Sequence, residues 1–256
     1  MRAFVAFFKK EIYESLRSGK LLILLCLFVA FGVMNPAIAK LTPYLFRMLS
    51  EELAESGMVI TEVTVDALTS WTQFFKNIPM ALIAFVLLYS GIFTGEYAAE
   101  TLVLMLTKGL ARYKVVLAKS LLLFMLWSAG YWLCFGVTYG YNAYYWDNGT
   151  VSGLVPASVN WWLFGVLVLS LTVLFSTLLR HYGGVLLLTG GSVFIMYLLG
   201  LVPKLEAYMP TSLMNSAELL VGAATWGDFA ESLAVTAVCC TVCWLISVPI
   251  FNRKQL

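Results

Sequence analysis

Long apolar segments dominate the sequence, and they restrict the fold more than any other feature. Six of them occur, at about residues 21–39, 79–94, 115–139, 161–179, 183–202 and 232–251. An α-helix needs roughly 20 apolar residues to cross a hydrocarbon core about 30 Å thick. The composition agrees, because 61% of the 256 residues are hydrophobic and only 12% are charged, unlike soluble proteins. We expect an all-α, polytopic membrane protein with six transmembrane helices in a single domain, residues 1–256.

The distribution of basic residues predicts the orientation of these helices. If both termini are cytosolic, the cytosolic segments hold twelve of the 16 Lys and Arg residues, and the outer segments, 40–78 and 203–231, hold four. Basic residues are enriched on the cytosolic side of membrane proteins. The four outer basic residues are Lys40, Arg47, Lys76 and Lys204. We therefore expect a multi-pass protein with a cytosolic N-terminus and a cytosolic C-terminus.

Two amphipathic stretches flank the first two apolar segments. In residues 1–20, the apolar side chains Phe4, Phe8, Ile12 and Leu16 recur every four residues, which is typical of a helix lying in the membrane interface. A frayed cytosolic tail is the alternative. We do not expect a signal peptide, because the stretch lacks a small-residue cleavage site. Residues 66–75 are rich in Trp and Phe and predict a second, separate interfacial helix.

The segment between the second and third apolar stretches has an ordered pattern of charge. Glu96 and Glu100 are four residues apart, so a helix places them on one face. Acids at the start of a helix and bases at its end suit the helix dipole. We predict one cytosolic helix from Glu96 to Lys108, ended by Gly109.

This segment resembles the one between spans two and three of ABC-2 type export permeases, the transmembrane subunits of bacterial ABC exporters. The resemblance is carried by Glu96, Glu100-Thr101-Leu102, Leu104, Leu106, Thr107 and Arg112, with Lys119 at the mouth of the next span. Gly109 stands where the family more often has proline, and both residues end a helix. The topology is similar over the whole chain, whereas the motif covers about 25 residues.

Several expectations follow from that resemblance. It implies a permease in the bacterial plasma membrane that pairs with a second protomer, as a homodimer or a heterodimer. Each protomer would dock on a separate ABC ATPase subunit through a coupling helix, with the N-terminal helix as a second contact. The expected partner-binding residues are Glu96, Tyr97, Glu100, Thr101, Leu102, Met105, Lys108 and Arg112.

The sequence argues against catalysis by this chain. It has no G-x-x-x-x-G-K-[ST] phosphate loop, and its single histidine, His181, cannot form an HExxH zinc site. All five cysteines lie in apolar segments, where packing is the expected role. We expect no catalytic, cofactor or metal site, no nucleic-acid partner, and ATP hydrolysis on a partner subunit.

The predicted spans are poor in ionisable groups. Ion-coupled transporters usually need such groups at membrane depth. This favours a permease driven by an ATPase. The Tyr- and Trp-rich stretch 139–146 favours an amphipathic or hydrophobic cargo such as a peptide.

The alternative from another class is a non-transporting immunity or scaffold protein that binds a partner in the bilayer. Glycines along span five, among them Gly190 and Gly191, allow close packing either inside one protomer or between two.

Overall fold

A computed structural model describes residues 2–54, 65–98, 101–107, 109–215 and 217–254. No strand occurs in this part of the chain, and six of its helices are long and apolar enough to cross a membrane. The helices are α1 (Arg2–Arg17), α2 (Lys20–Ala54), α3 (Ala67–Tyr89), α4 (Thr94–Ala98), α5 (Thr101–Thr107), α6 (Arg112–Tyr145), α7 (Leu154–Leu178), α8 (Tyr182–Gly200), α9 (Ala217–Leu220) and α10 (Ala230–Arg253). Short 3₁₀ turns are η1 (Asn148–Thr150), η2 (Glu206–Tyr208), η3 (Pro210–Met214) and η4 (Trp226–Phe229).

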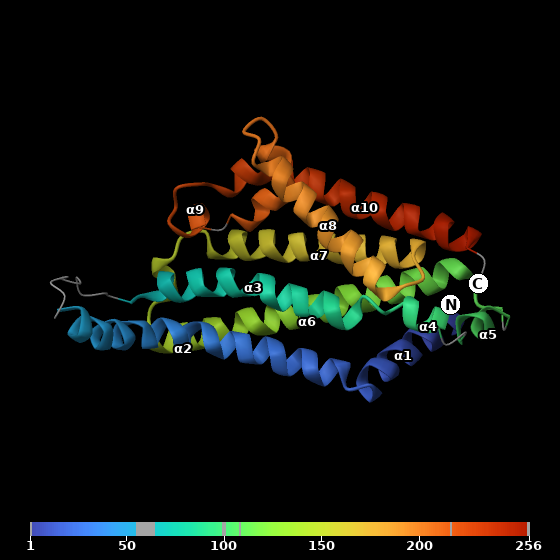
Figure 1. Ribbon diagram of the computed structural model, residues 1–256, viewed down its shortest axis with the longest axis horizontal. Coiled ribbons are helices and arrows are strands. Elements are labelled where there is room, and N and C mark those ends of the chain that lie inside the picture. Colours follow the sequence, from blue (N-terminus) through green and yellow to red (C-terminus); the bar gives the residue numbers. More distant parts are fainter. Residues whose placement is uncertain (1, 55–64, 99–100, 108, 216, 255–256) are drawn as a thin grey trace.

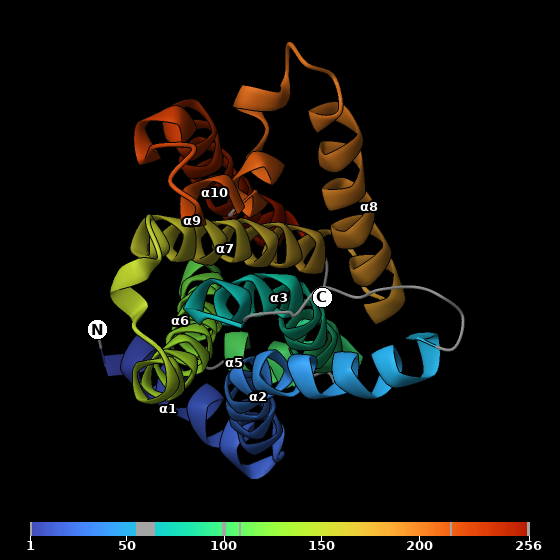
Figure 2. The same cartoon turned by 90° about the vertical axis from the view of Figure 1, so that its left-hand side faces the viewer.

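The long helices form an elongated bundle with two different ends (Figure 1). Both chain ends lie at the end that carries α1, α4 and α5, which we name the basal end. The connection between α6 and α7, and the turns around α9, lie toward the opposite end, which we name the distal end. Helix α2 packs against α3 and α6, whereas α7 packs against α10. Helix α8 leans away from the bundle and leaves most of its surface exposed (Figures 1 and 2).

Large aromatic side chains fill the space between α2, α3, α6 and α7. Trp71, Phe74, Trp127 and Tyr131 are fully buried, and edge-to-face contacts join Phe74 to Tyr131 and Trp127 to Phe28. Such pairs contribute about 0.5–1.5 kcal/mol beyond the burial of their area. This packing makes α2, α3, α6 and α7 the rigid part against which the basal elements lie.

The prediction of six spans is confirmed, and the largest departures from the predicted bounds are at the end of α2 and the start of α3. Residues 40–54 continue α2 and do not form a separate outer helix. Residues 67–75, predicted as a separate interfacial helix, form the first turns of α3, capped by Asp66 Oδ1, which accepts from the backbone N–H of Thr69 at 2.9 Å. The physical reason is that the buried face of α3 runs without a break from Trp71 through Phe85. Residues 55–64 lie outside the described part of the chain.

Several polar groups within the spans form hydrogen bonds between helices. Pro36 lies inside α2 and cannot donate to the carbonyl of Gly32, and the Thr138 hydroxyl donates to that carbonyl at 3.0 Å. Asn77 Nδ2 donates to Asn35 Oδ1 at 2.8 Å, which joins α3 to α2. Because lipid offers no hydrogen bonds, these contacts keep α2, α3 and α6 in register.

Candidate functional site

Helix α1 lies across the basal end and packs against α6 and α2. Its buried side chains are Phe7, Glu11 and Ser15, each four residues after the last. Of the apolar residues predicted to anchor this helix, Phe4 and Phe8 pack against the core and Ile12 is half-buried. Leu16, by contrast, is 50% exposed. Residues 2–17 thus form a helix, and the face that it buries in the protein includes a carboxylate.

That carboxylate belongs to a cluster of five charged side chains, Lys10, Glu11, Glu14, Glu96 and Lys119, which we name the basal ion cluster. Lys10 Nζ lies 3.0 Å from Glu11 Oε1, 2.6 Å from Glu14 Oε2 and 2.7 Å from Glu96 Oε1. Lys119 Nζ lies 2.8 Å from Glu11 Oε2 and 2.9 Å from Glu96 Oε2. The cluster therefore joins α1, α4 and α6 through ion pairs and charged hydrogen bonds.

Burial makes this cluster different from a surface salt bridge. Glu96 is 6% exposed and Lys119 is 1% exposed, and the Lys119 ammonium lies 5.5 Å from the centre of the Phe93 ring. Lys119 donates a hydrogen bond to Glu11, whereas its contact with Glu96 Oε2 is an ion pair without directed hydrogen-bond geometry. Removing one member of a buried pair leaves an uncompensated charge, which costs about 3–5 kcal/mol.

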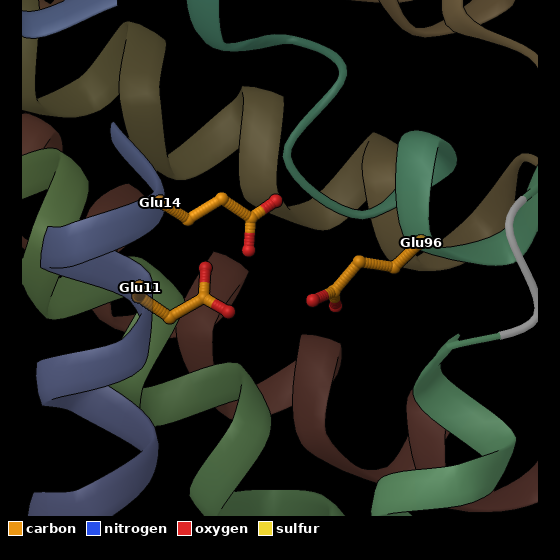
Figure 3. Close-up of side chains that lie close together, drawn as sticks. All are labelled: Glu11, Glu14 and Glu96. Carbon is orange, nitrogen blue, oxygen red and sulfur yellow. The ribbon is translucent and has the colours of Figure 1, made fainter. Parts of the chain in front are cut away.

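Lys10 is the centre of the cluster. In Figure 3, Glu11 and Glu14 extend from α1 toward Glu96, which extends from the opposite side. Burial alone would lower the pKa of Lys10, but hydrogen bonds to Glu14 and Glu96, and the charge of Glu11, outweigh burial and raise this pKa well above its usual value. Lys10 therefore stays charged throughout the physiological range of pH.

The three carboxylates also meet the distance requirement for a metal site, because their oxygens lie within 4.8 Å of one another. In this arrangement the Lys10 ammonium lies within 3.0 Å of each of them and supplies the positive charge itself. A cavity of about 210 Å³ borders the cluster and is lined by Glu11, Glu14 and Glu96 among others. Ser15 and Tyr89 also line this cavity, and their hydroxyls lie 2.7 Å apart and tie α1 to α3.

The structure describes part of the predicted coupling helix. Helices α4 and α5 cover Thr94–Ala98 and Thr101–Thr107, whereas Glu100 and Lys108 lie outside the described residues. Gly109 has the positive φ of a helix-ending residue, 87°, as predicted. Glu96 faces into the bundle, where its carboxylate contacts Lys10 and Lys119. Leu102 is buried, Met105 packs against the core, and Thr101 is exposed.

Two other predicted residues, Tyr97 and Arg112, hold the ends of distant helices. The Tyr97 hydroxyl donates to the carbonyl of Ser176 in the last turn of α7 at 3.4 Å. Arg112 Nη1 donates to the carbonyls of Phe251, Asn252 and Lys254, at 3.0, 3.2 and 2.6 Å, and so caps the C-terminus of α10. Orphan carbonyls at a helix C-terminus favour such a cation.

Lys254 completes this arrangement at the C-terminus. Its ammonium donates to the carbonyls of Thr177 and Leu179, at 2.8 and 2.9 Å, and lies 4.1 Å from the centre of the Tyr97 ring. Burial and the nearby charge of Arg180 lower the pKa of Lys254 to about 8. Residues 94–112 are thus bonded directly to α1, α6, α7 and the end of α10.

Sequence reasoning missed the basal ion cluster. Lys119 was assigned to the mouth of a span, and the expectation that the spans hold no ionisable group of consequence is wrong for this residue, which is fully buried in α6. One signal was present, because Lys119 is a lone charge in the apolar run from Val115 to Leu126. Glu11 gave a second signal, since it shares a helix face with Phe4, Phe7 and Phe8.

Comparison with known proteins agrees with this architecture. Residues 5–256 match the family described as ABC-2 family transporter protein. No curated protein matches the chain with significant similarity. The family match spans nearly the whole sequence, including all six long apolar helices and the basal ion cluster. The chain is therefore a multi-pass membrane protein that belongs to the ABC-2 family of transporter proteins.

Proposed function

We propose that this chain is the transmembrane permease of an ATP-driven exporter and that its basal end faces the cytosol, where a separate ABC ATPase docks on it. Members of the ABC-2 family are membrane transport components that work with such an ATPase. In this proposal, the permease lies in the bacterial plasma membrane, pairs with a second permease protomer, and moves an amphipathic or hydrophobic molecule outward. The excess of basic residues at the basal end supports the orientation.

One observation carries the proposal: Glu96 and Tyr97 of α4, and Arg112 at the start of α6, bond to four helices at the basal end. Glu96 contacts Lys10 of α1 and Lys119 of α6, Tyr97 contacts α7, and Arg112 contacts the end of α10. A push on residues 94–112 therefore reaches these four helices directly. Separating a buried ion pair is costly, so α1 and α6 follow α4 when it moves. Rigid-body tilting of this kind underlies many transport cycles.

The predicted partner-binding residues then divide into two roles. Glu96, Tyr97 and Arg112 act as positioning residues, because their polar atoms are engaged inside the protomer. Docking of the ATPase falls to exposed positions of the segment, such as Thr101. Glu100 and Lys108 remain proposed docking residues on the basis of the family resemblance.

A pair of variants tests docking and transmission separately. Thr101→Arg places a bulky charge on the exposed side of α5 and should lower the amount of ATPase that copurifies, without changing the thermal stability of the permease. Val221→Arg is the matched control, because Val221 is 61% exposed in the distal connection before α10.

Glu96→Gln should keep ATPase copurification but weaken the stimulation of ATP hydrolysis by the permease. Glu231→Gln is its control, since Glu231 is exposed at the start of α10 and lies outside the basal ion cluster.

Two outcomes would contradict the proposal. The first is full ATPase recovery by Thr101→Arg together with unchanged stimulation of hydrolysis by Glu96→Gln. The second is the failure of any ABC ATPase to copurify with the wild-type protein, which would favour the non-transporting scaffold or immunity protein.

A further inference from the structure

An apolar groove of about 520 Å³ runs between α3, α7 and α8. Its walls include Ile83 and Leu87 of α3, Phe164 of α7, and Leu186 and Val193 of α8. The groove exists because α8 leans away from the bundle (Figure 2), so that apolar faces that would pack in a tight bundle stay apart. An open apolar groove of this size is typical of a binding site.

A second cavity of about 560 Å³, which we name the acidic cup, adjoins the distal end of this groove. Tyr197 lines both cavities, so they are neighbours along α8. Glu206, Glu218 and Asp228 line the cup, and no Lys or Arg is among its described lining residues. Lys204 belongs to the same connection but does not line the cup. The two cavities together offer an apolar surface that ends in negative charge.

Resting on the proposed export function, we propose that the groove and the acidic cup bind the cargo, and that this cargo is an amphipathic cationic peptide. Its apolar side chains would lie against α3, α7 and α8, and its Lys or Arg side chains would enter the cup. Charge complementarity carries this choice of occupant. An anionic phospholipid fits less well, because its net negative charge would face three carboxylates, and no Lys or Arg among the described lining residues offsets them.

The dimensions of the groove agree with a peptide. Its wall on α8 extends from Leu186 to Tyr197, which is eleven residue steps, or about 16 Å at 1.5 Å per residue. That length matches about three turns of a bound helix. An amphipathic helix laid into an apolar groove is a common mode of peptide recognition.

The chain offers a matched pair of glycines for the test. A Cβ atom added at Gly190 or at Gly191 meets no other atom within 4 Å, so both positions have room for a side chain to begin. Gly190 lines the groove, whereas Gly191 does not. Gly190→Trp therefore fills the groove, and Gly191→Trp adds the same bulk elsewhere on α8.

The experiment measures binding of a fluorescein-labelled 14-residue Leu/Lys peptide to the full-length permease in nanodiscs of neutral lipid. Empty nanodiscs correct for partitioning into lipid, and size-exclusion chromatography checks each variant. Gly190→Trp should raise the Kd about tenfold, equivalent to about 1.4 kcal/mol, while Gly191→Trp leaves it unchanged. Glu206→Gln combined with Glu218→Gln should weaken binding of the Lys peptide about fivefold but not that of a Leu/Gln peptide. Glu231→Gln, at the exposed start of α10, is the control for the cup.

Each remaining outcome overturns the inference. Peptide binding no greater than that of empty nanodiscs, or equal binding by Gly190→Trp, removes the peptide site. Loss of copurified phospholipid in Gly190→Trp, with peptide binding intact, assigns the groove to lipid. A change from dimer to monomer in that variant, again with peptide binding intact, assigns it to a second copy of the chain. Because binding is measured on the permease alone, the failure of an ATPase to copurify contradicts the proposed function and not this site.

Discussion

Lys119 Nζ and Glu96 Oε2 lie 2.9 Å apart, although Lys119 belongs to the membrane-spanning helix α6 and Glu96 to the short helix α4. Both side chains are buried. Glu11 of α1 also contacts Lys119, at 2.8 Å. One ammonium group thus fixes the position of an N-terminal helix and of the segment after the second span, and both depend on its charge.

The first prediction concerns that charge. Lys119→Met removes the buried cation that lies against Glu11 Oε2 and Glu96 Oε2 and leaves both carboxylates to share Lys10, so the free energy of unfolding should fall by about 3–5 kcal/mol. Thermal unfolding in detergent, followed by intrinsic tryptophan fluorescence, measures this change. Buried Trp127 contributes to that signal. Lys114→Met is the control, because Lys114 is half-exposed on the same helix.

A second substitution sharpens this test. Adding Glu96→Gln to Lys119→Met removes one of the two opposed carboxylates and should restore part of the lost stability. If Lys119→Met unfolds at the wild-type temperature, or if the double variant is less stable than Lys119→Met, the cluster does not hold α4 against α6.

Local sequence patterns predicted the six spans because length and hydropathy determine whether a helix can cross a membrane, without knowledge of its neighbours. They also predicted the helix end at Gly109, since a positive φ favours glycine. The basal ion cluster has a different origin. Lys10 and Glu96 are 86 residues apart in sequence, and Glu11 and Lys119 are 108 apart. Helical spacing within either segment cannot show which charges meet.

The same distinction explains the errors at the span ends. Residues 40–78 were predicted as an outer segment separate from the first span, whereas α2 continues through Pro36 and Pro43. The bond from Thr138 to the carbonyl of Gly32 compensates for Pro36, and that bond depends on the packing of α2 against α6. A tertiary contact thus extends a helix that its own sequence appeared to end.

The second prediction concerns orientation. If the basal end is cytosolic, a single cysteine at Ala223, exposed in the distal connection, should react with a membrane-impermeant maleimide in intact cells. A single cysteine at Thr101, exposed in α5, should react only after permeabilisation. The five native cysteines are replaced first. The reverse labelling pattern would invert the topology and place the predicted ATPase contact outside the cell.

The third prediction concerns packing between α6 and α7. Gly165 lies directly against the fully buried indole of Trp127, and an added Cβ would overlap that ring. Gly165→Ala should therefore lower the free energy of unfolding by about 1–3 kcal/mol, as overpacking of a core does. Gly191→Ala, which meets no atom within 4 Å, should unfold at the wild-type temperature. Equal stability of the two variants would show that α6 and α7 are not packed closely at this point.

The fourth prediction concerns the C-terminal Lys254, whose pKa of about 8 results from burial and from the charge of Arg180. About half of this side chain is neutral at pH 8, compared with roughly one in 250 for a lysine with the usual pKa of 10.4. An amine-acylating reagent at pH 8 should therefore modify Lys254 faster than the other lysines, as measured by mass spectrometry of the digest at short times. Lys254→Arg removes the signal and identifies the peptide.

The same lowered pKa determines the sign of a pH effect on stability. Between about pH 8 and 10.5, the unfolded chain binds more protons at Lys254 than the folded chain does, so the contribution of this group to stability rises with pH. Lys254→Met should lack that rise when thermal unfolding is compared with wild type across this range. If Lys254 is acylated at pH 8 no faster than the other lysines, its ammonium is not held against α7 and Tyr97.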